Sequence, residues 1–187
     1  FIPAAAMLLS LELRTPNAEI IILGSREFSP FVTDKDFHFW AQRGKLDLFF
    51  ISAIEIDKYG NFNLHVIGPR DEPNVVFPGQ YGTGMLYYTV PRIVMFRTEH
   101  TKRTFVENVD FISAAGSSPE RMTRRTKEVK IITPMAVLNF NRTTGLMELG
   151  SIHADYSIMD VKDNTGFNIV YPKETLTTPH VTEDEVH

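Results

Sequence analysis

The sequence predicts one α/β domain with a mostly parallel, open sheet flanked by helices. Continuous apolar runs rich in β-branched residues, "EIIIL" at 19–23 and "RIVMFR" at 92–97, are typical of strands buried on both faces. Segments with helical spacing separate such runs. The chain has 187 residues, 43% of them hydrophobic, which suffices for one full core and is short for two. We therefore expect a single domain over 1–187.

The first part of the chain alternates helix and strand. Ala4, Met7, Leu8 and Leu11 recur at helical spacing after Pro3, which suits a first helical turn. The predicted elements, in order, are a core-facing helix over 4–13, a buried strand at 19–23, a helix near 33–42 and an interior strand in "LDLFFISAIEI" at 46–56.

The second part is richer in strands. Ser157 can cap a helix in "SIMDVKDNTGF", and Gly166 can end it. The other predicted elements are an interior strand at 92–97, strands in "KEVKIIT" at 127–133 and "AVLNF" at 136–140, and a hairpin turn at 141–145.

Both ends look incomplete. The start "FIPAAAMLL" has no initiator methionine and no charged leader, and its apolar run is too short to span a bilayer. We expect neither a signal peptide nor a membrane span, and we expect residues to be missing in front. The acidic end "TEDEVH" has no Gly or Pro stop signal, so residues can be missing there too.

Composition excludes several classes of function. The chain has 19 basic and 23 acidic residues, a net charge of −4, which predicts no binding to nucleic acid or to an anionic membrane. It has no cysteine, which excludes disulfides, thiolate metal sites and a cysteine nucleophile, and is ordinary for a cytoplasmic protein. The six histidines lack metal-binding spacing, so we expect no metal.

Loops that follow buried strands are the first places to seek a site, because ligands bind beyond the carboxyl ends of strands in open α/β sheets. Three qualify: "GSREFSP", "DKYGNFN" and "PGQYGTG". The third holds Gly79, Gly82 and Gly84, which let backbone amides approach a ligand or an oxyanion. It matches neither the dinucleotide nor the Walker pattern, and a plain strand-to-helix turn is the alternative.

The loop "DKYGNFN" has more amides than a turn needs. Asn61 after Gly60 suits a sharp turn, whereas Asn63 stands where a strand should already have begun. Glu55 ends an apolar strand, so it is either a site carboxylate with an environment-shifted pKa or a satisfied buried acid.

Four motifs in one order resemble family I coenzyme A transferases, specifically the B (β) subunit of the glutaconate CoA-transferase type. They span about residues 50–167 and read "ISAIEIDKYGNFNLHVIGP", "FPGQYGTG", "EHTKRTFVENVDFISAAG" and "VKDNTGF". The resemblance implies a NagB/RpiA-like α/β fold and a homologous A (α) subunit as partner in a heterodimer or larger heteromer. It also implies an active site at their interface and an acyl-CoA substrate, with coenzyme A as part of the substrate and no permanently bound cofactor.

The resemblance also implies a nucleophilic glutamate in the loop "IIILGSREFSP", but Leu23 stands at its place. CoA transfer needs a covalent relay, which leucine cannot supply. Glu27, four residues on, is one candidate, and Glu55, where the family has glutamine, is a second candidate as a base or as a salt-bridge partner. A hydrolase or lyase acting on a CoA thioester, or a non-catalytic subunit that completes the A subunit's site, are the alternatives.

The remaining site residues also follow from the resemblance. Gly79, Gly82 and Gly84 carry the CoA-binding or oxyanion role, although "YGTG" lacks one glycine of the family's pair, and Asn61 and Asn63 shape the acyl-CoA pocket. The basic run "ERMTRRTKEVK" either contacts the phosphates of CoA or is a solvated loop.

Overall fold

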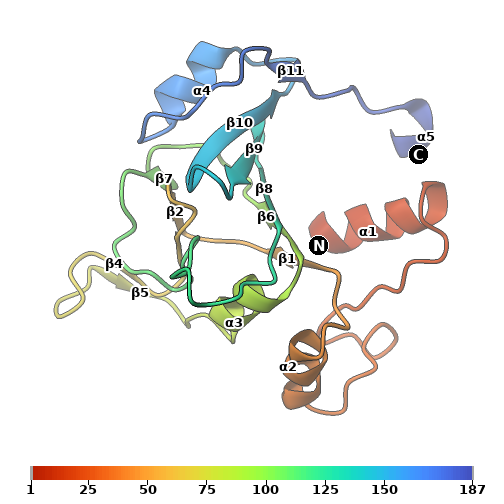
Figure 1. Cartoon of the computed structure of the whole chain (residues 1–187). Helices are drawn as coiled ribbons and strands as arrows, with labels where there is room; N and C mark the ends of the chain where they lie inside the picture. The colour runs from red at the N-terminus through yellow and green to blue at the C-terminus, as the bar shows by residue number, and fades with distance from the viewer. Residues whose placement is uncertain (1, 187) are drawn as a thin grey trace. The chain divides into compact units, whose positions relative to one another are not determined.

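Figure 1 shows a computed structural model of the chain, which describes residues 2–186. Contacts within the chain divide it into two compact units. Unit 1 comprises the residues up to Phe39 together with the segment from His180 onward, and unit 2 comprises Trp40–Pro179. The single domain over 1–187 stays a prediction.

Unit 1 contains two helices, α1 (Ile2–Leu13) and α5 (Glu183–Val186), joined by an ion pair between Arg14 and Glu185. The helix predicted over 4–13 is confirmed, but none of its described residues is buried, so its core-facing role is wrong within this structure. Helix α2 (Asp34–Gln42) confirms the prediction near 33–42 and passes from unit 1 into unit 2.

The strand predicted at 19–23 is wrong. The backbone N–H of Ile22 donates to the carbonyl of Phe28 at 3.0 Å, and the chain turns at Gly24, whose φ is +81°. A β-branched run becomes a strand only when a neighbouring strand pairs with its backbone groups, and here a local loop takes that bond.

Unit 2 is built on a six-stranded sheet in the order β1-β6-β8-β9-β10-β11 (Figure 1). Its strands are β1 (Leu48–Ile51), β6 (Arg92–Phe96), β8 (Glu128–Ile132), β9 (Ala136–Asn141), β10 (Leu146–Ile152) and β11 (Leu176–Thr177). The strands β1, β6 and β8 are parallel, whereas β9 is antiparallel to both of its neighbours. The predicted α/β class is confirmed, as are the strands from 92 onward and the turn at 141–145.

The apolar run 46–56 is two strands rather than one. After β1 the Ser52 hydroxyl donates to the carbonyl of Phe96 at 3.1 Å, and the chain bends at Ile54 before it enters β2 (Glu55–Asp57). Strand β2 belongs to a second sheet, with β3 (Phe62–Asn63) antiparallel to it and β7 (Phe105–Val106) parallel. Within the described residues β1 is an edge of its sheet, so the expectation of an interior strand there is wrong.

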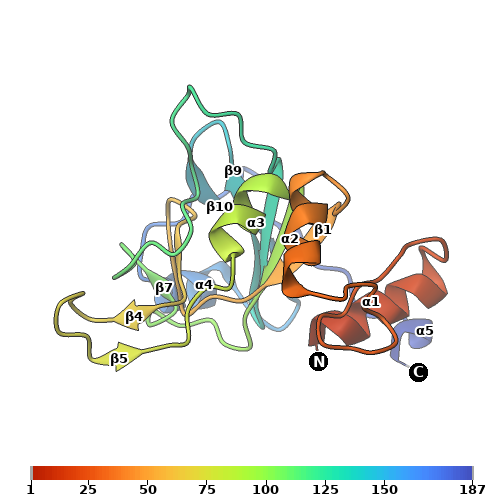
Figure 2. The same cartoon turned by 90° about the horizontal axis from the view of Figure 1, so that it is seen from below.

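Three further elements complete unit 2. The hairpin of β4 (Val66–Ile67) and β5 (Val75–Val76) projects from the rest of the unit in both Figure 1 and Figure 2. Helix α3 (Thr83–Thr89) follows the glycine-rich loop, and α4 (Ile158–Asn164) follows β10. Among residues 2–186, no helix is long and apolar enough to cross a bilayer.

The ends of α4 agree only partly with the prediction. The Ser157 hydroxyl accepts from the backbone N–H of Asp160 and the Asp160 side chain accepts from Ser157 in return, which confirms the cap. The helix ends at Thr165 with extended backbone, so Gly166 is not its left-handed stop. A Cβ at Gly166 would lie 2.3 Å from the carbonyl oxygen of Phe105, which is why only glycine fits there.

The core of unit 2 draws side chains from both sheets and from α3. Ile56 and Phe62 of the smaller sheet, Met95 of the larger sheet and Tyr87 of α3 are all 0% exposed. The Phe62 and Tyr87 rings meet edge to face, with centroids 4.9 Å apart. This packing holds β2, β3 and α3 together, and the candidate site lies in the loops that connect them.

Candidate functional site

Glu55 and Asn63 face each other across the β2–β3 pair, and both are buried, at 5% and 0% exposure. The Asn63 amide donates to Glu55 Oε2 at 2.7 Å, and the backbone N–H of Asp110 donates to the same oxygen at 2.9 Å. A buried carboxylate is tolerated only when donors satisfy it. The structure therefore pairs Glu55 with Asn63, and their role in a site stays a prediction.

Asn63 also shapes the chain that follows it. Its amide donates to the carbonyl of Val66 at 2.6 Å, and its carbonyl oxygen accepts from the backbone N–H of His65 at 2.9 Å. A side chain that bonds the backbone two and three residues on forms a turn. Asn63 is therefore the residue that directs the chain from β3 into the hairpin, which is why an amide stands inside a strand pattern.

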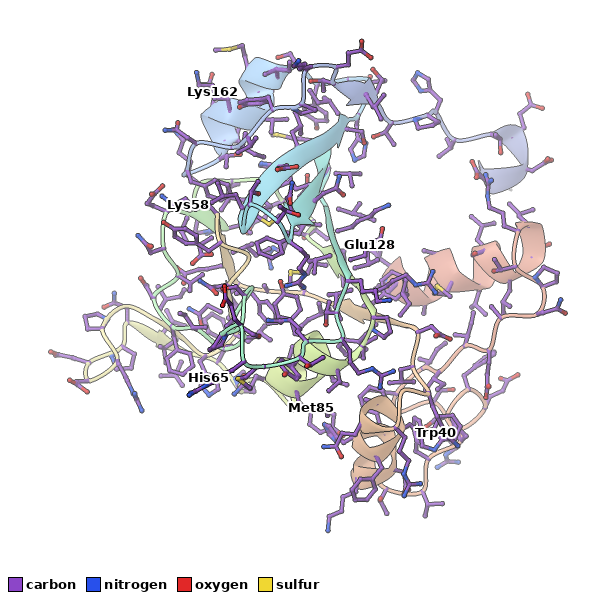
Figure 3. The ribbon with its side chains drawn as sticks, in the orientation of Figure 1. Trp40, Lys58, His65, Met85, Glu128 and Lys162 are labelled. Atoms are coloured by element: carbon purple, nitrogen blue, oxygen red, sulfur yellow. The ribbon has the colours of Figure 1, made fainter. Side chains whose placement is uncertain are left out.

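His65 lies against the glycine-rich loop. In the view of Figure 3 it sits between the β4–β5 hairpin and α3. Its ring packs on that of Phe111 with centroids 4.9 Å apart, and a Cβ at Gly79 would lie 3.3 Å from its Cε1. Its Nδ1 is buried and has no hydrogen-bond partner among the described residues. Gly79, with φ +100°, is thus needed for both its conformation and its closeness to the imidazole.

The loop over 79–84 is held in an unusual backbone conformation. Gly82 has φ +70°, and Tyr81 has φ +36°, which makes Tyr81 the one non-glycine residue with positive φ in the described chain. Left-handed backbone costs a non-glycine residue about 1–2 kcal/mol. Strain of this kind is concentrated at ligand-binding loops and active sites. The side-chain oxygen of Gln80 is also buried without a partner among the described residues.

The segment 110–116 contacts both the chain after β3 and the glycine-rich loop. The hydroxyl of Ser113 accepts from the backbone N–H of Leu64 at 2.8 Å, and its carbonyl oxygen would lie 3.1 Å from a Cβ at Gly84. Asp110, in the same segment, bonds Glu55. Glu55 and Gly84 therefore both lie against this segment, while Asn63 and Gly79 are both next to His65.

Asn61 belongs to a different network. Its amide donates to Asp57 Oδ2 at 2.9 Å, and its carbonyl oxygen accepts from the backbone N–H of Gly116 at 2.9 Å. Burial raises the pKa of Asp57, and the hydrogen bonds from Asn61 and Tyr59 oppose that shift. Asn61 therefore holds the tip of the β2–β3 hairpin, while Asn63 lies at the opposite end of that pair, beside Glu55.

Glu27 lies in unit 1, and its side chain is exposed. Its backbone N–H donates to the hydroxyl of Ser25 at 3.2 Å, within the turn that follows Leu23. Leu23 is 44% exposed. The two predicted carboxylates therefore differ sharply, because Glu55 is buried and hydrogen-bonded and Glu27 is open to solvent.

Sequence reasoning missed three residues of the site: His65, Asp110 and Ser113. All lie inside the motifs already quoted, "GNFNLHVIGP" and "ENVDFIS". Their polar type among apolar neighbours was the available signal, but pairing partners 49 and 55 positions apart cannot be read from the chain. Among residues 2–186, no three His, Asp or Glu side chains gather closely enough to hold a metal ion.

Comparison with known proteins adds a family and several relatives. The coenzyme A transferase family model matches residues 17–164. The B subunit of a 3-oxoadipate CoA-transferase of Pseudomonas knackmussii is 27% identical over 160 residues, or 82% of this chain and 61% of the relative. The B subunit of a glutaconate CoA-transferase of Acidaminococcus fermentans is 30% identical over 128 residues, or 64% of this chain and 47% of the relative.

A third relative has a different activity in its name. The cholesterol ring-cleaving hydrolase IpdB subunit of Mycobacterium tuberculosis is 28% identical over 142 residues, which is 73% of this chain and 56% of the relative. The chain thus spans about half to three fifths of the length of the curated relatives it matches.

Solved structures share the fold. IpdAB of Rhodococcus jostii aligns with a TM-score of 0.83 at 20% identity, covering 100% of this chain and 81% of that one. Glutaconate coenzyme A-transferase of Acidaminococcus fermentans aligns with a TM-score of 0.80 at 19% identity, covering 99% and 82%.

Proposed function

This chain belongs to the coenzyme A transferase family, and on that premise we propose that it is the B-type subunit of a heteromeric enzyme that transfers CoA between carboxylic acids. The observation that carries the proposal is the site itself. The glycine-rich loop over 79–84, with its strained Tyr81, contacts His65, whose backbone bonds Asn63 of the buried Glu55–Asn63 pair. An A subunit as partner and an acyl-CoA as substrate are parts of this proposal.

The transfer requires a carboxylate that forms a covalent intermediate. The carboxylate attacks the thioester carbon, the C–S bond breaks and CoA leaves as a thiolate. The thiolate then attacks the resulting enzyme anhydride, releasing the first acid and leaving an enzyme–CoA thioester. Each attack places negative charge on a carbonyl oxygen, and backbone N–H groups of the glycine-rich loop are suited to stabilise that charge.

The two candidate carboxylates of this chain suit different roles. Both donors to Glu55 bond the same oxygen, Oε2, which fixes the carboxylate and makes it a poor nucleophile but a good positioning group for Asn63. Glu27 is exposed and therefore free to be reached by a thioester. We therefore propose Glu27 as the nucleophile of a transferase and Glu55 as the group that holds the loop after β3.

A hydrolase or lyase acting on a CoA thioester is the second candidate. The observation that favours it is Leu23, with Gly24 and Ser25 after it, where the family pattern has its nucleophilic glutamate. Water would then take the place of the carboxylate, and the base would come from the A subunit. If the A subunit also supplies every other reacting group, this chain is a non-catalytic partner that completes the site.

An adduct experiment separates these candidates. The chain is co-expressed with its A subunit, incubated with acyl-CoA thioesters and analysed by intact mass and peptide mapping. A transferase is expected to show a CoA adduct on this chain that Glu27→Gln abolishes and that Glu55→Gln, the same change at the other candidate carboxylate, retains. Release of free CoA without any adduct would contradict the transferase and support the hydrolase. No turnover in any reaction would contradict both.

A further inference from the structure

Two arginines from distant parts of the sequence converge on one loop of unit 2. Arg124 Nη1 donates to the hydroxyl of Ser118 at 3.2 Å, and Arg142 Nη1 donates to the carbonyl oxygen of Gly116 at 2.5 Å. Arg124 Nη2 also donates to the carbonyl oxygen of Tyr87 at 2.8 Å. Arg124 comes from the basic run before β8, and Arg142 from the turn after β9. A positively charged guanidinium group therefore bonds each end of the loop over 116–118.

Both arginines are half-buried, and some of their guanidinium nitrogens lack a hydrogen-bond partner. Nε of Arg124 and both Nε and Nη2 of Arg142 are buried without a hydrogen-bond partner among the described residues. Neither arginine takes part in an ion pair found among residues 2–186. Burial is the main cause that lowers the pKa of Arg124 to about 10; the charge of Arg142 contributes to this shift, and Tyr87 and Tyr88 oppose it. Unpaired donors in a folded protein call for a specific explanation, such as an unseen ion.

Aromatic rings lie against both guanidinium groups, but they do not supply acceptors for the nitrogens that lack a hydrogen bond. Arg124 lies over the Tyr87 ring at 4.7 Å, and Arg142 lies over the Phe140 ring at 4.9 Å. Stacking satisfies the flat faces of guanidinium groups and leaves the N–H groups at their edges for oxygen acceptors. The two cations are thus held in place, while Nε of Arg124 and Nε and Nη2 of Arg142 stay without a hydrogen-bond partner among the described residues.

We propose that Arg124 and Arg142 form a binding site for a phosphate group. A phosphate monoester carries close to two negative charges at neutral pH and three acceptor oxygens, which suits two cations and three unpaired nitrogens. Guanidinium forks suit phosphate geometry. A carboxylate has one charge and two oxygens, and would leave part of the cluster unpaired.

The phosphate site adjoins the β2–β3 hairpin. Gly116 accepts from Arg142 through its carbonyl and donates through its N–H to Asn61. A phosphate bound to Arg142 would therefore act on the same loop that holds Asn61. Arg124 belongs to the basic run, so the run would contact a phosphate rather than be only a solvated loop. The source of the phosphate rests on the proposed function, since coenzyme A carries phosphate groups and free phosphate is the alternative.

The test measures phosphate binding by calorimetry on the full chain, at ionic strength balanced with chloride. Arg124→Gln and Arg142→Gln are each expected to weaken inorganic phosphate binding about tenfold or more, because each removes charge-assisted hydrogen bonds. Arg121→Gln, an exposed arginine of the same segment, is the matched control and should bind within about twofold of wild type. Arg124→Lys and Arg142→Lys keep the charge without the fork and should fall between.

Four ligands separate the possible outcomes. Coenzyme A that competes with inorganic phosphate, while pantetheine does not, would identify the coenzyme as the source. Phosphate binding without coenzyme A binding would support the site and assign it to free phosphate. Equal binding by all variants, no phosphate binding, or glutarate binding in place of phosphate would each overturn the proposal. Turnover is not needed for any of these readouts, so failure of the transferase proposal would be seen separately.

Discussion

The side chain of Asn63 is the single group on which most of the site's hydrogen bonds depend. Asn63→Ala removes its bonds to Glu55 and to the backbone of the following turn. We expect the free energy of unfolding to fall by about 2–4 kcal/mol, since a buried carboxylate loses a donor. Asn168→Ala, at an exposed position of unit 2, should change stability by less than about 0.5 kcal/mol. Equal effects in chemical denaturation would show that Asn63 has no special role.

His100 makes the stability of unit 2 depend on pH. Its Nδ1 lies 2.9 Å from the Thr133 hydroxyl and its Nε2 lies 3.0 Å from that of Thr165, and it is 2% exposed. Burial lowers its pKa to about 4, below the ordinary value of about 6.5. As pH falls from about 6.5 to about 4, the unfolded chain gains a proton that the folded chain does not, so folded stability falls.

The expected loss from His100 over that range is about 2–3 kcal/mol, from the size of the pKa difference. Urea denaturation at a series of pH values measures it. In His100→Gln, less stable at neutral pH, the slope between pH 6.5 and 4 should be shallower, while His180→Gln, an exposed control, should keep the wild-type slope. A wild-type stability that is flat over this range would contradict the assignment.

For the helices and strands, the sharpest prediction concerns the junction between α4 and β7. A Cβ at Gly166 would lie 2.3 Å from the carbonyl oxygen of Phe105, whose N–H···O bond with Gly166 measures 2.7 Å. Gly166→Ala must push the helix end away from β7 and should lower the free energy of unfolding by more than about 2 kcal/mol. Gly145→Ala meets only open space at φ +70° and should cost about 1–2 kcal/mol. Thermal melts that rank them in reverse would refute this packing.

For the molecule as a whole, the proposed function predicts that the backbone conformation of the glycine-rich loop affects turnover. Gly82→Ala forces a Cβ onto backbone at φ +70° and should re-aim the loop's N–H groups, lowering turnover of the assembled enzyme about tenfold to a hundredfold. Gly145 has the same φ of +70° in the β9–β10 turn, so Gly145→Ala is a matched control for strain. Equal rates in the two variants at equal stability would remove the loop from the chemistry.

How far the sequence predicts this protein differs along the chain. Periodicity located α1, α2, β6, β8 and β9, because their patterns are local and long enough to be read. It failed at 19–23, where β-branched residues form a loop, and at 46–56, where one apolar run serves two sheets. An apolar run shows only that a segment is buried or paired, and Ser52, which lies between the two strands, bonds the carbonyl of Phe96, 44 positions away.

The candidate site shows the same division. The sequence by itself determined the family motifs and the glycine-rich loop, and it singled out Glu55 and Asn63 as candidates, because residue type and spacing are written in the chain. Only the tertiary structure separated Asn61 from Asn63, brought Asp110 and Ser113 to the site, and gathered Arg124 and Arg142 around one loop. These contacts join residues far apart in sequence, and the packing of β2, β3 and α3 against the larger sheet decides which of them meet.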